Sequence, residues 1–138
     1  GTNPVLIQSP TSKKGGRKKG NNPFYLAIFH SVSTIPGDGT FKSYTMGAFT
    51  FTASRPFKLM AISGLPFMDK DLYQGAYAEN WRRMYDYVVF PMTLAKETDK
   101  TLLLSFGWQD RYAMIGRLNL QAVLDTLVPV GEFANYRY

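Results

Sequence analysis

Hydrophobic and aromatic residues recur along this chain in short runs of strand length, separated by turn-forming residues. The clearest alternation lies in FTFT, where Phe49 and Phe51 alternate with threonines and so lie on one face of a strand. Gly, Pro, Asp and Asn separate the runs, most clearly in IPGDG at residues 35–39. The pattern predicts an all-β protein of antiparallel strands joined by turns.

Two groups of three such runs predict two antiparallel meanders of similar length. The first covers residues 24–63, with strands over FYLAIFHSVS, FKSYTMGAFTFTAS and FKLMAIS. The second covers residues 84–119, with strands over MYDYVVFPM, TLLLSFGW and RYAMIGRLN and a tight QD turn before the last. Residues 64–83 have no clean period, so we expect a long connection there, with a short helix over residues 76–83.

The spacing of four aliphatic residues predicts a short helix near the C-terminus, with Asn119 as its N-cap. These residues are Leu120, Val123, Leu124 and Leu127. The remaining residues, up to residue 138, form a tail without a clear pattern. In this organisation residues 120–138 are a short helix and a tail.

Repetition of a meander is typical of β-propellers, whose blades are four-stranded sheets of about 40–50 residues each. On that count the 138 residues hold two blades and part of a third, within a larger assembly. A self-contained β-sandwich or barrel fits the same number of strands. Periodicity alone does not separate these two architectures.

Positive charge is concentrated in one segment, residues 9–23, which we expect to be a flexible loop. Its five basic residues are Lys13, Lys14, Arg17, Lys18 and Lys19. Of the 16 basic residues, the other eleven face ten acidic residues, so the rest of the chain is balanced. The loop suits phosphate, RNA or an acidic surface, although such runs are commonly solvated insertions. Because no aromatic residue alternates with the lysines, nucleic acid is not favoured as a partner.

Composition excludes several other classes of protein. The chain has no cysteine and one histidine, which excludes a disulfide scaffold and leaves almost no ligands for structural zinc. We therefore expect no metal and no cofactor. No apolar run approaches the roughly 18 residues that span a bilayer. No signal-peptide pattern is visible either, so the compartment is not assigned.

Candidate chemistry rests on a few polar residues within the strands and turns. His30 lies in an apolar strand, as either a hydrogen-bonded structural residue or a site residue. Asp110 stands at a hairpin tip, where it is either a turn former or, beside Trp108, a ligand for sugar hydroxyls. Asp86 is a second carboxylate. A glycosidase needs two carboxyl groups across one bond, and the sequence does not show that these two converge.

Several strings occur together in a characteristic order. They are VLI near the start, YLAIFHS at Tyr25–Ser31, YTMGAFTFTASRPFKLMAIS at Tyr44–Ser63, VVFPM at Val88–Met92 and LLLSFGWQD at Leu102–Asp110. The ordered set resembles the C-terminal half of the mannoside phosphorylase-like family, glycoside hydrolase family 130 and related mannosyltransferases. Members of that family are five-bladed β-propellers. The resemblance therefore implies that this chain forms two to three propeller blades.

The resemblance also implies which residues line a site. The counterpart of His30 lies near the phosphate or sugar, and the counterpart of Asp110 binds the sugar in the central cleft. Trp108 and Tyr112 would then wall the pocket, while Asp86 stands where an asparagine is common. The general acid of the family belongs to its N-terminal half, so no catalytic residue is expected in this segment. The basic loop has no counterpart in the family.

The implied function is glycosyl transfer or phosphorolysis of mannosides by the complete propeller of which this chain is a part. Inorganic phosphate or a sugar phosphate would be a substrate rather than a cofactor. The rest of the propeller would come from the same protein or from another chain. The alternative is a non-catalytic module that binds a carbohydrate or a partner, with the basic loop as its docking segment.

Overall fold

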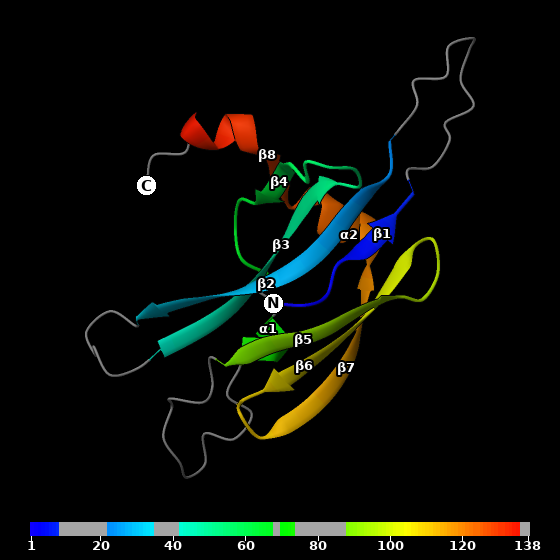
Figure 1. Cartoon of the computed structure of the whole chain (residues 1–138). Helices are drawn as coiled ribbons and strands as arrows, with labels where there is room; N and C mark the ends of the chain where they lie inside the picture. The colour runs from blue at the N-terminus through cyan, green and yellow to red at the C-terminus, as the bar shows by residue number, and fades with distance from the viewer. Residues whose placement is uncertain (9–21, 35–41, 68–69, 74–87, 136–138) are drawn as a thin grey trace.

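The computed structural model describes residues 1–8, 22–34, 42–67, 70–73 and 88–135. Within these residues the chain forms two antiparallel sheets (Figure 1). Sheet A has five strands in the order β1 (Val5–Ile7), β2 (Phe24–Thr34), β3 (Lys42–Thr52), β4 (Leu59–Ser63) and β8 (Leu127–Pro129). Sheet B has three strands in the order β5 (Val89–Lys96), β6 (Thr101–Trp108) and β7 (Tyr112–Asn119). The prediction of an antiparallel, mostly β protein is therefore confirmed.

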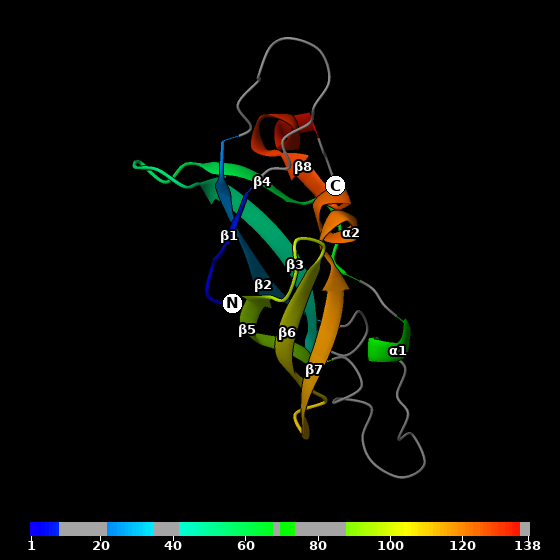
Figure 2. The same ribbon diagram turned by 90° about the vertical axis from the view of Figure 1, so that its right-hand side faces the viewer.

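Helical segments are short, and two of the three directly follow a strand. The described helices are α1 (Lys70–Tyr73), α2 (Leu120–Asp125) and a 3-10 helix, η2 (Val130–Asn135). Figure 2 shows α2 continuing directly from the end of β7. Asn119 caps α2 as predicted, because its side-chain oxygen accepts a hydrogen bond from the Ala122 N–H at 3.0 Å. No helix among the described residues is long and apolar enough to cross a membrane.

The long hairpin of β2 and β3 determines the inner face of sheet A. Its register pairs Phe24 with Thr52 and continues without a break to Thr34 and Lys42. Because side chains alternate along a strand, Leu26 and Ile28 share one face with Met46 and Ala48 of the neighbouring strand. All four side chains are buried.

Sheet B packs against that inner face, with β5 nearest to β1, β2 and β3. Strand β6 alternates regularly, so that Leu102, Leu104 and Phe106 are buried. They join the inner residues of sheet A and two residues of α2, Leu120 and Val123, in one hydrophobic core. The core therefore lies between the two sheets and extends under α2.

The outer face of sheet A carries a row of aromatic rings. Phe51 is at its centre, with its ring centroid 5.3 Å from that of Tyr25, 5.9 Å from Phe49 and 6.3 Å from Phe57. Phe29 extends the row and lies over Gly47, where an added Cβ would come within 2.6 Å of its ring. Sheet A is consequently apolar on both faces, unlike a sheet with one face toward water.

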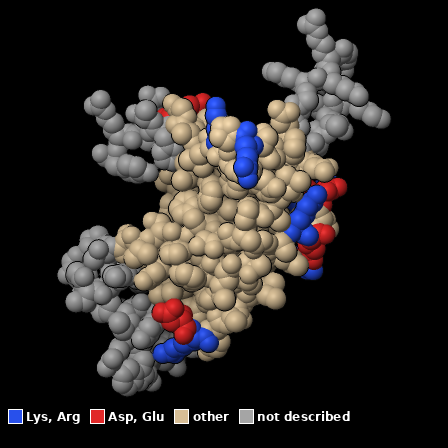
Figure 3. All heavy atoms as spheres, in the orientation of Figure 1, with Lys and Arg blue, Asp and Glu red and all other residues tan. Residues whose placement is uncertain are grey.

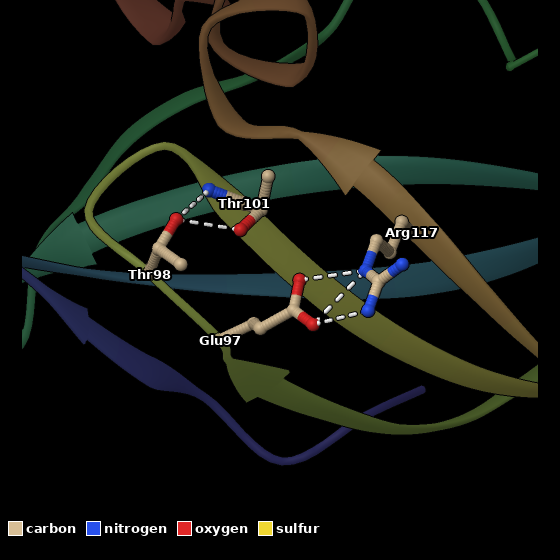
Figure 4. A network of polar contacts seen from close by, with 4 residues as sticks. All are labelled: Glu97, Thr98, Thr101 and Arg117. Atoms are coloured by element: carbon tan, nitrogen blue, oxygen red, sulfur yellow. Dashed lines mark hydrogen bonds and ion pairs between the residues drawn. The ribbon is translucent and has the colours of Figure 1, made fainter.

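The turn between β5 and β6 is held by polar contacts on the surface (Figure 4). The Thr98 hydroxyl accepts hydrogen bonds from the backbone N–H groups of Lys100 and Thr101, both at 3.1 Å. Arg117 of β7 forms a bidentate pair with Glu97, with its Nε 2.9 Å from both carboxylate oxygens and its Nη2 2.7 Å from Oε1. The turn is thus tied to the far strand of sheet B.

Two sequence predictions differ from the structure in their boundaries. The strand predicted over residues 84–92 begins at Val89, after an isolated bridge at Val88, and continues to Lys96. The strand tolerates Pro91 because β5 is the edge strand of sheet B and its register shifts at a bulge between Pro91 and Thr93. At such a position proline breaks no hydrogen bond of the ladder. The helix predicted up to Leu127 ends at Asp125, since Leu127 pairs with Ser63 in sheet A. The short helix predicted over residues 76–83 and the loop core at residues 9–21 lie outside the described residues.

Candidate functional site

Four segments that are distant in sequence meet at one end of the two sheets. They are the last part of β2, the first part of β3, the start of β5 and the turn between β6 and β7, at the lower left of Figure 1. Tyr44 forms a parallel bridge with Val88, and the Gln109 N–H donates to the Val88 carbonyl at 2.8 Å. The ring of Tyr44 lies 6.2 Å from the imidazole of His30. We refer to His30, Tyr44, Val88 and Gln109 as the site row.

His30 is half-buried and packs mainly on an aromatic ring. The centroids of the imidazole and the Phe90 ring are 4.3 Å apart, with the planes tilted by 38°. Its Nδ1 is buried and has no hydrogen-bond partner in the part of the chain that the structure describes. A buried polar atom without a partner costs about 1–3 kcal/mol. His30 therefore does not behave as a hydrogen-bonded core histidine with respect to the described residues.

Phe90 connects His30 to the hairpin that carries the predicted aspartate. Its ring contacts the imidazole, and its backbone pairs with Gly107 of β6. The next pair in the ladder joins Val89 to Trp108, at the end of β6. The structure thus places His30 and the β6–β7 turn at the same end of the two sheets.

The β6–β7 turn holds its two central residues in the left-handed region. The φ angles of Gln109 and Asp110 are 55° and 52°, a conformation that aspartate tolerates better than glutamine. The Arg111 N–H donates to the Trp108 carbonyl at 3.1 Å and closes the turn. Asp110 is exposed, so its carboxylate is presented to solvent by a backbone that is fixed on both sides.

Trp108 and Tyr112 face each other across the base of the same turn. They are register partners in β6 and β7, and their ring centroids are 5.9 Å apart. The Trp108 indole N–H donates to the Leu72 carbonyl of α1 at 2.8 Å, which fixes the orientation of the ring. Tyr112 is 43% exposed. The pair therefore provides an aromatic surface at the base of the turn that carries Asp110.

Gln109 is the residue at this end that the sequence analysis missed. It is 2% exposed, although glutamine is usually a surface residue, and its Nε2 has no hydrogen-bond partner among the described residues. From sequence, the QD pair indicated only a tight turn. The only hint in the sequence that Gln109 is special is that glutamine occupies a short hairpin turn where glycine or asparagine is usual.

Tyr73 of α1 has a third buried polar atom near the same strands. Burial raises the pKa of its hydroxyl to about 12, and Met46, the register partner of His30, lies close to it. The oxygen forms no hydrogen bond with the described residues. His30, Gln109 and Tyr73 together leave three unpaired polar atoms, which is typical of sites completed by a ligand, by water or by further protein.

Asp86 and the five basic residues of the predicted loop lie outside the described residues. Figure 3 shows the described surface on one face as mostly uncharged, with acidic and basic side chains in small mixed groups. Within the described residues, no three His, Cys, Asp or Glu side chains gather as a metal site would require.

Comparisons with known proteins add no assignment. The chain matches no protein-family model, no curated protein and no solved structure. The residues at this end of the sheets and the sequence resemblance are therefore the basis for a function.

Proposed function

We propose that this chain is part of a carbohydrate-active β-propeller that transfers or phosphorolyses mannosides. The observation that carries the proposal is the β6–β7 turn, which holds an exposed Asp110 at the tip of the hairpin whose base carries the Trp108–Tyr112 aromatic pair. Aromatic rings stack on the apolar face of a sugar, while a carboxylate accepts hydrogen bonds from its hydroxyl groups. The same end of the sheets contains His30 with an unpaired Nδ1.

The arrangement of the two sheets supports two successive propeller blades. Each contains a three-strand meander, and the sheets pack through one shared core. Strand β5, at the edge of its own sheet, lies against β1, β2 and β3. In a propeller, repeated sheets of this kind pack around a central channel.

Each residue has a defined part in the proposed reaction. Asp110 holds sugar hydroxyl groups in place, and Trp108 and Tyr112 form a wall that orients the ring. His30 donates a hydrogen bond to a phosphate oxygen, most strongly as the imidazolium. A carboxylic acid from another part of the propeller protonates the leaving oxygen while phosphate attacks from the opposite face. This chain therefore contributes binding and orientation rather than the proton donor.

The test uses Asp110→Asn in the native protein. Asparagine tolerates the left-handed backbone, so the turn and the thermal midpoint should be retained. Loss of a charged hydrogen-bond acceptor should lower the rate of phosphate release from mannose 1-phosphate with a mannoside acceptor about 10- to 100-fold. Asp125→Asn is the matched control, because Asp125 is an exposed aspartate in α2 that accepts a hydrogen bond from Gln121, at the other end of β7 from the β6–β7 turn.

Three results would count against this assignment. A loss of activity that is accompanied by a clearly lower thermal midpoint in Asp110→Asn would show that Asp110 is structural. Full activity in the variant would remove Asp110 from the site. Binding of mannosides by the native protein without any phosphate release would favour the non-catalytic carbohydrate-binding module.

A further inference from the structure

Gln109 combines two unfavourable features at one residue. Its side chain is 2% exposed, and its amide nitrogen finds no acceptor among the described residues. Its backbone has a φ of 55°, which is uncommon for a residue other than glycine, asparagine or aspartate. A glycine would relieve the backbone and would leave no buried amide. Such costs persist mainly where a functional site requires them.

Backbone contacts place Gln109 at the same end of the sheets as His30. Gln109 donates its backbone N–H to Val88, which bridges to Tyr44, whose ring faces the imidazole of His30. The site row therefore contains two side chains with an unpaired buried nitrogen, Gln109 Nε2 and His30 Nδ1. Both residues lie within the same group of strand ends as the exposed Asp110.

We propose that Gln109 is a ligand-binding residue whose carboxamide donates a hydrogen bond to a ligand oxygen held beside His30. This proposal rests on the proposed function and adds a specificity residue to the same site. A carboxamide N–H is a neutral donor, so its partner is an oxygen acceptor. Two groups share that chemistry: a hydroxyl group of the sugar and an oxygen of the phosphate.

The experiment compares Gln109→Met with the native protein. Methionine keeps the length of the side chain and removes the amide. Without ligand, the thermal midpoint should stay unchanged or rise, because the variant no longer buries an unpaired donor. Affinity for the contacted probe should fall about 10-fold, as expected for one lost hydrogen bond. Calorimetric titrations with a methyl mannoside and with inorganic phosphate separate the two sources of the oxygen.

Controls make each outcome decisive. Gln8→Met changes an exposed glutamine and should alter neither affinity nor stability. Gln109→Gly is the second variant, since glycine adopts the left-handed backbone without strain and should give the same loss of affinity. A loss for the mannoside alone assigns a sugar hydroxyl as the acceptor, and a loss for phosphate alone assigns a phosphate oxygen.

The outcomes also separate this proposal from the proposed function. Unchanged affinity for both probes in Gln109→Met and Gln109→Gly would overturn the role of Gln109 and leave the carbohydrate site intact. A lower thermal midpoint in both variants would make Gln109 a structural residue if the folded protein still binds the methyl mannoside and inorganic phosphate with native affinity. A native protein that binds neither probe would overturn both proposals.

Discussion

The side chain of Asn3 satisfies both backbone groups of Leu94, a residue 91 positions further along the chain. The Asn3 Nδ2 donates to the Leu94 carbonyl at 2.9 Å, and the Leu94 N–H donates to Oδ1 at 3.1 Å. Leu94 lies in β5, the edge strand of sheet B, and is 1% exposed. A carboxamide has the same donor and acceptor as a peptide group, so Asn3 takes the place of a further strand at this point.

The neighbouring residue ties the same segment to the other sheet. The Thr2 N–H donates to the Ile28 carbonyl at 2.8 Å, and the Ile28 N–H donates to the Thr2 hydroxyl at 3.0 Å. Thr2 thus contacts β2 of sheet A, while Asn3 contacts β5 of sheet B. Two adjacent residues hold the sheets together near the strands that carry the candidate site.

Asn3→Ala should destabilise the protein by about 2 kcal/mol, because it leaves the backbone N–H and carbonyl of Leu94 without partners. Denaturant unfolding measures this loss. The stability of Asn3→Asp should lie between that of the native protein and that of Asn3→Ala. Aspartate keeps an acceptor for the Leu94 N–H and loses the donor to the Leu94 carbonyl. Asn22→Ala changes an exposed asparagine and is the control. Equal stability of Asn3→Ala and Asn22→Ala would show that the contact contributes nothing.

Leu104→Ala should lower the free energy of unfolding by about 3 kcal/mol, as expected for a leucine removed from a packed core. Leu104 is 1% exposed and belongs to the core between the sheets. Ile115→Ala on the next strand should change stability by less than about 0.5 kcal/mol, because Ile115 is 75% exposed. A comparable loss in both variants would mean that the outer face of sheet B is covered in the native protein.

The pair of Glu97 and Arg117 predicts a pH dependence at acid pH. Hydrogen bonding to Arg117 holds the pKa of the Glu97 carboxyl below its ordinary value. A depressed pKa in the folded state stabilises the fold above the unfolded pKa, and this stabilisation is lost as the pH falls through the folded pKa. Arg117→Gln should therefore return the Glu97 pKa toward its ordinary value and weaken the acid dependence of stability.

NMR titration of the side-chain carboxyl of Glu97 measures this shift. Asp99 provides an internal control, because hydrogen bonding to Lys96 lowers its pKa independently of Arg117. The pKa of Asp99 should stay the same in Arg117→Gln. An unchanged Glu97 pKa in that variant would show that the bidentate contact is not formed in solution.

Local features of the fold could be predicted from the sequence because they depend on neighbouring residues. The alternation of Phe49 and Phe51 with threonines predicted the β3 strand, and the apolar run TLLLSFGW predicted β6. Asn119 was recognisable as a cap because its partner, Ala122, is three residues away. Turn residues between the strands limited the topology to antiparallel meanders.

The candidate site could be predicted only as a set of residue types. His30 and Asp110 stood out because an imidazole and a carboxylate carry chemistry, and Trp108 and Tyr112 because aromatic rings accompany sugars. Gln109 did not stand out, since burial of a polar turn residue leaves no periodic pattern. The sequence placed Asp86 among the candidates on the same grounds as Asp110, and it lies outside the described residues.

Short-range alternation and turn preferences are enough to place most strands and to assign side chains to one face or the other. The pairing of β8 with β4, the contact of Asn3 with the edge of β5 and the position of Gln109 at the same strand ends as His30 become visible only in the folded chain. These contacts join segments far apart in the chain. Their formation depends on packing around one shared core, which no local stretch of sequence contains.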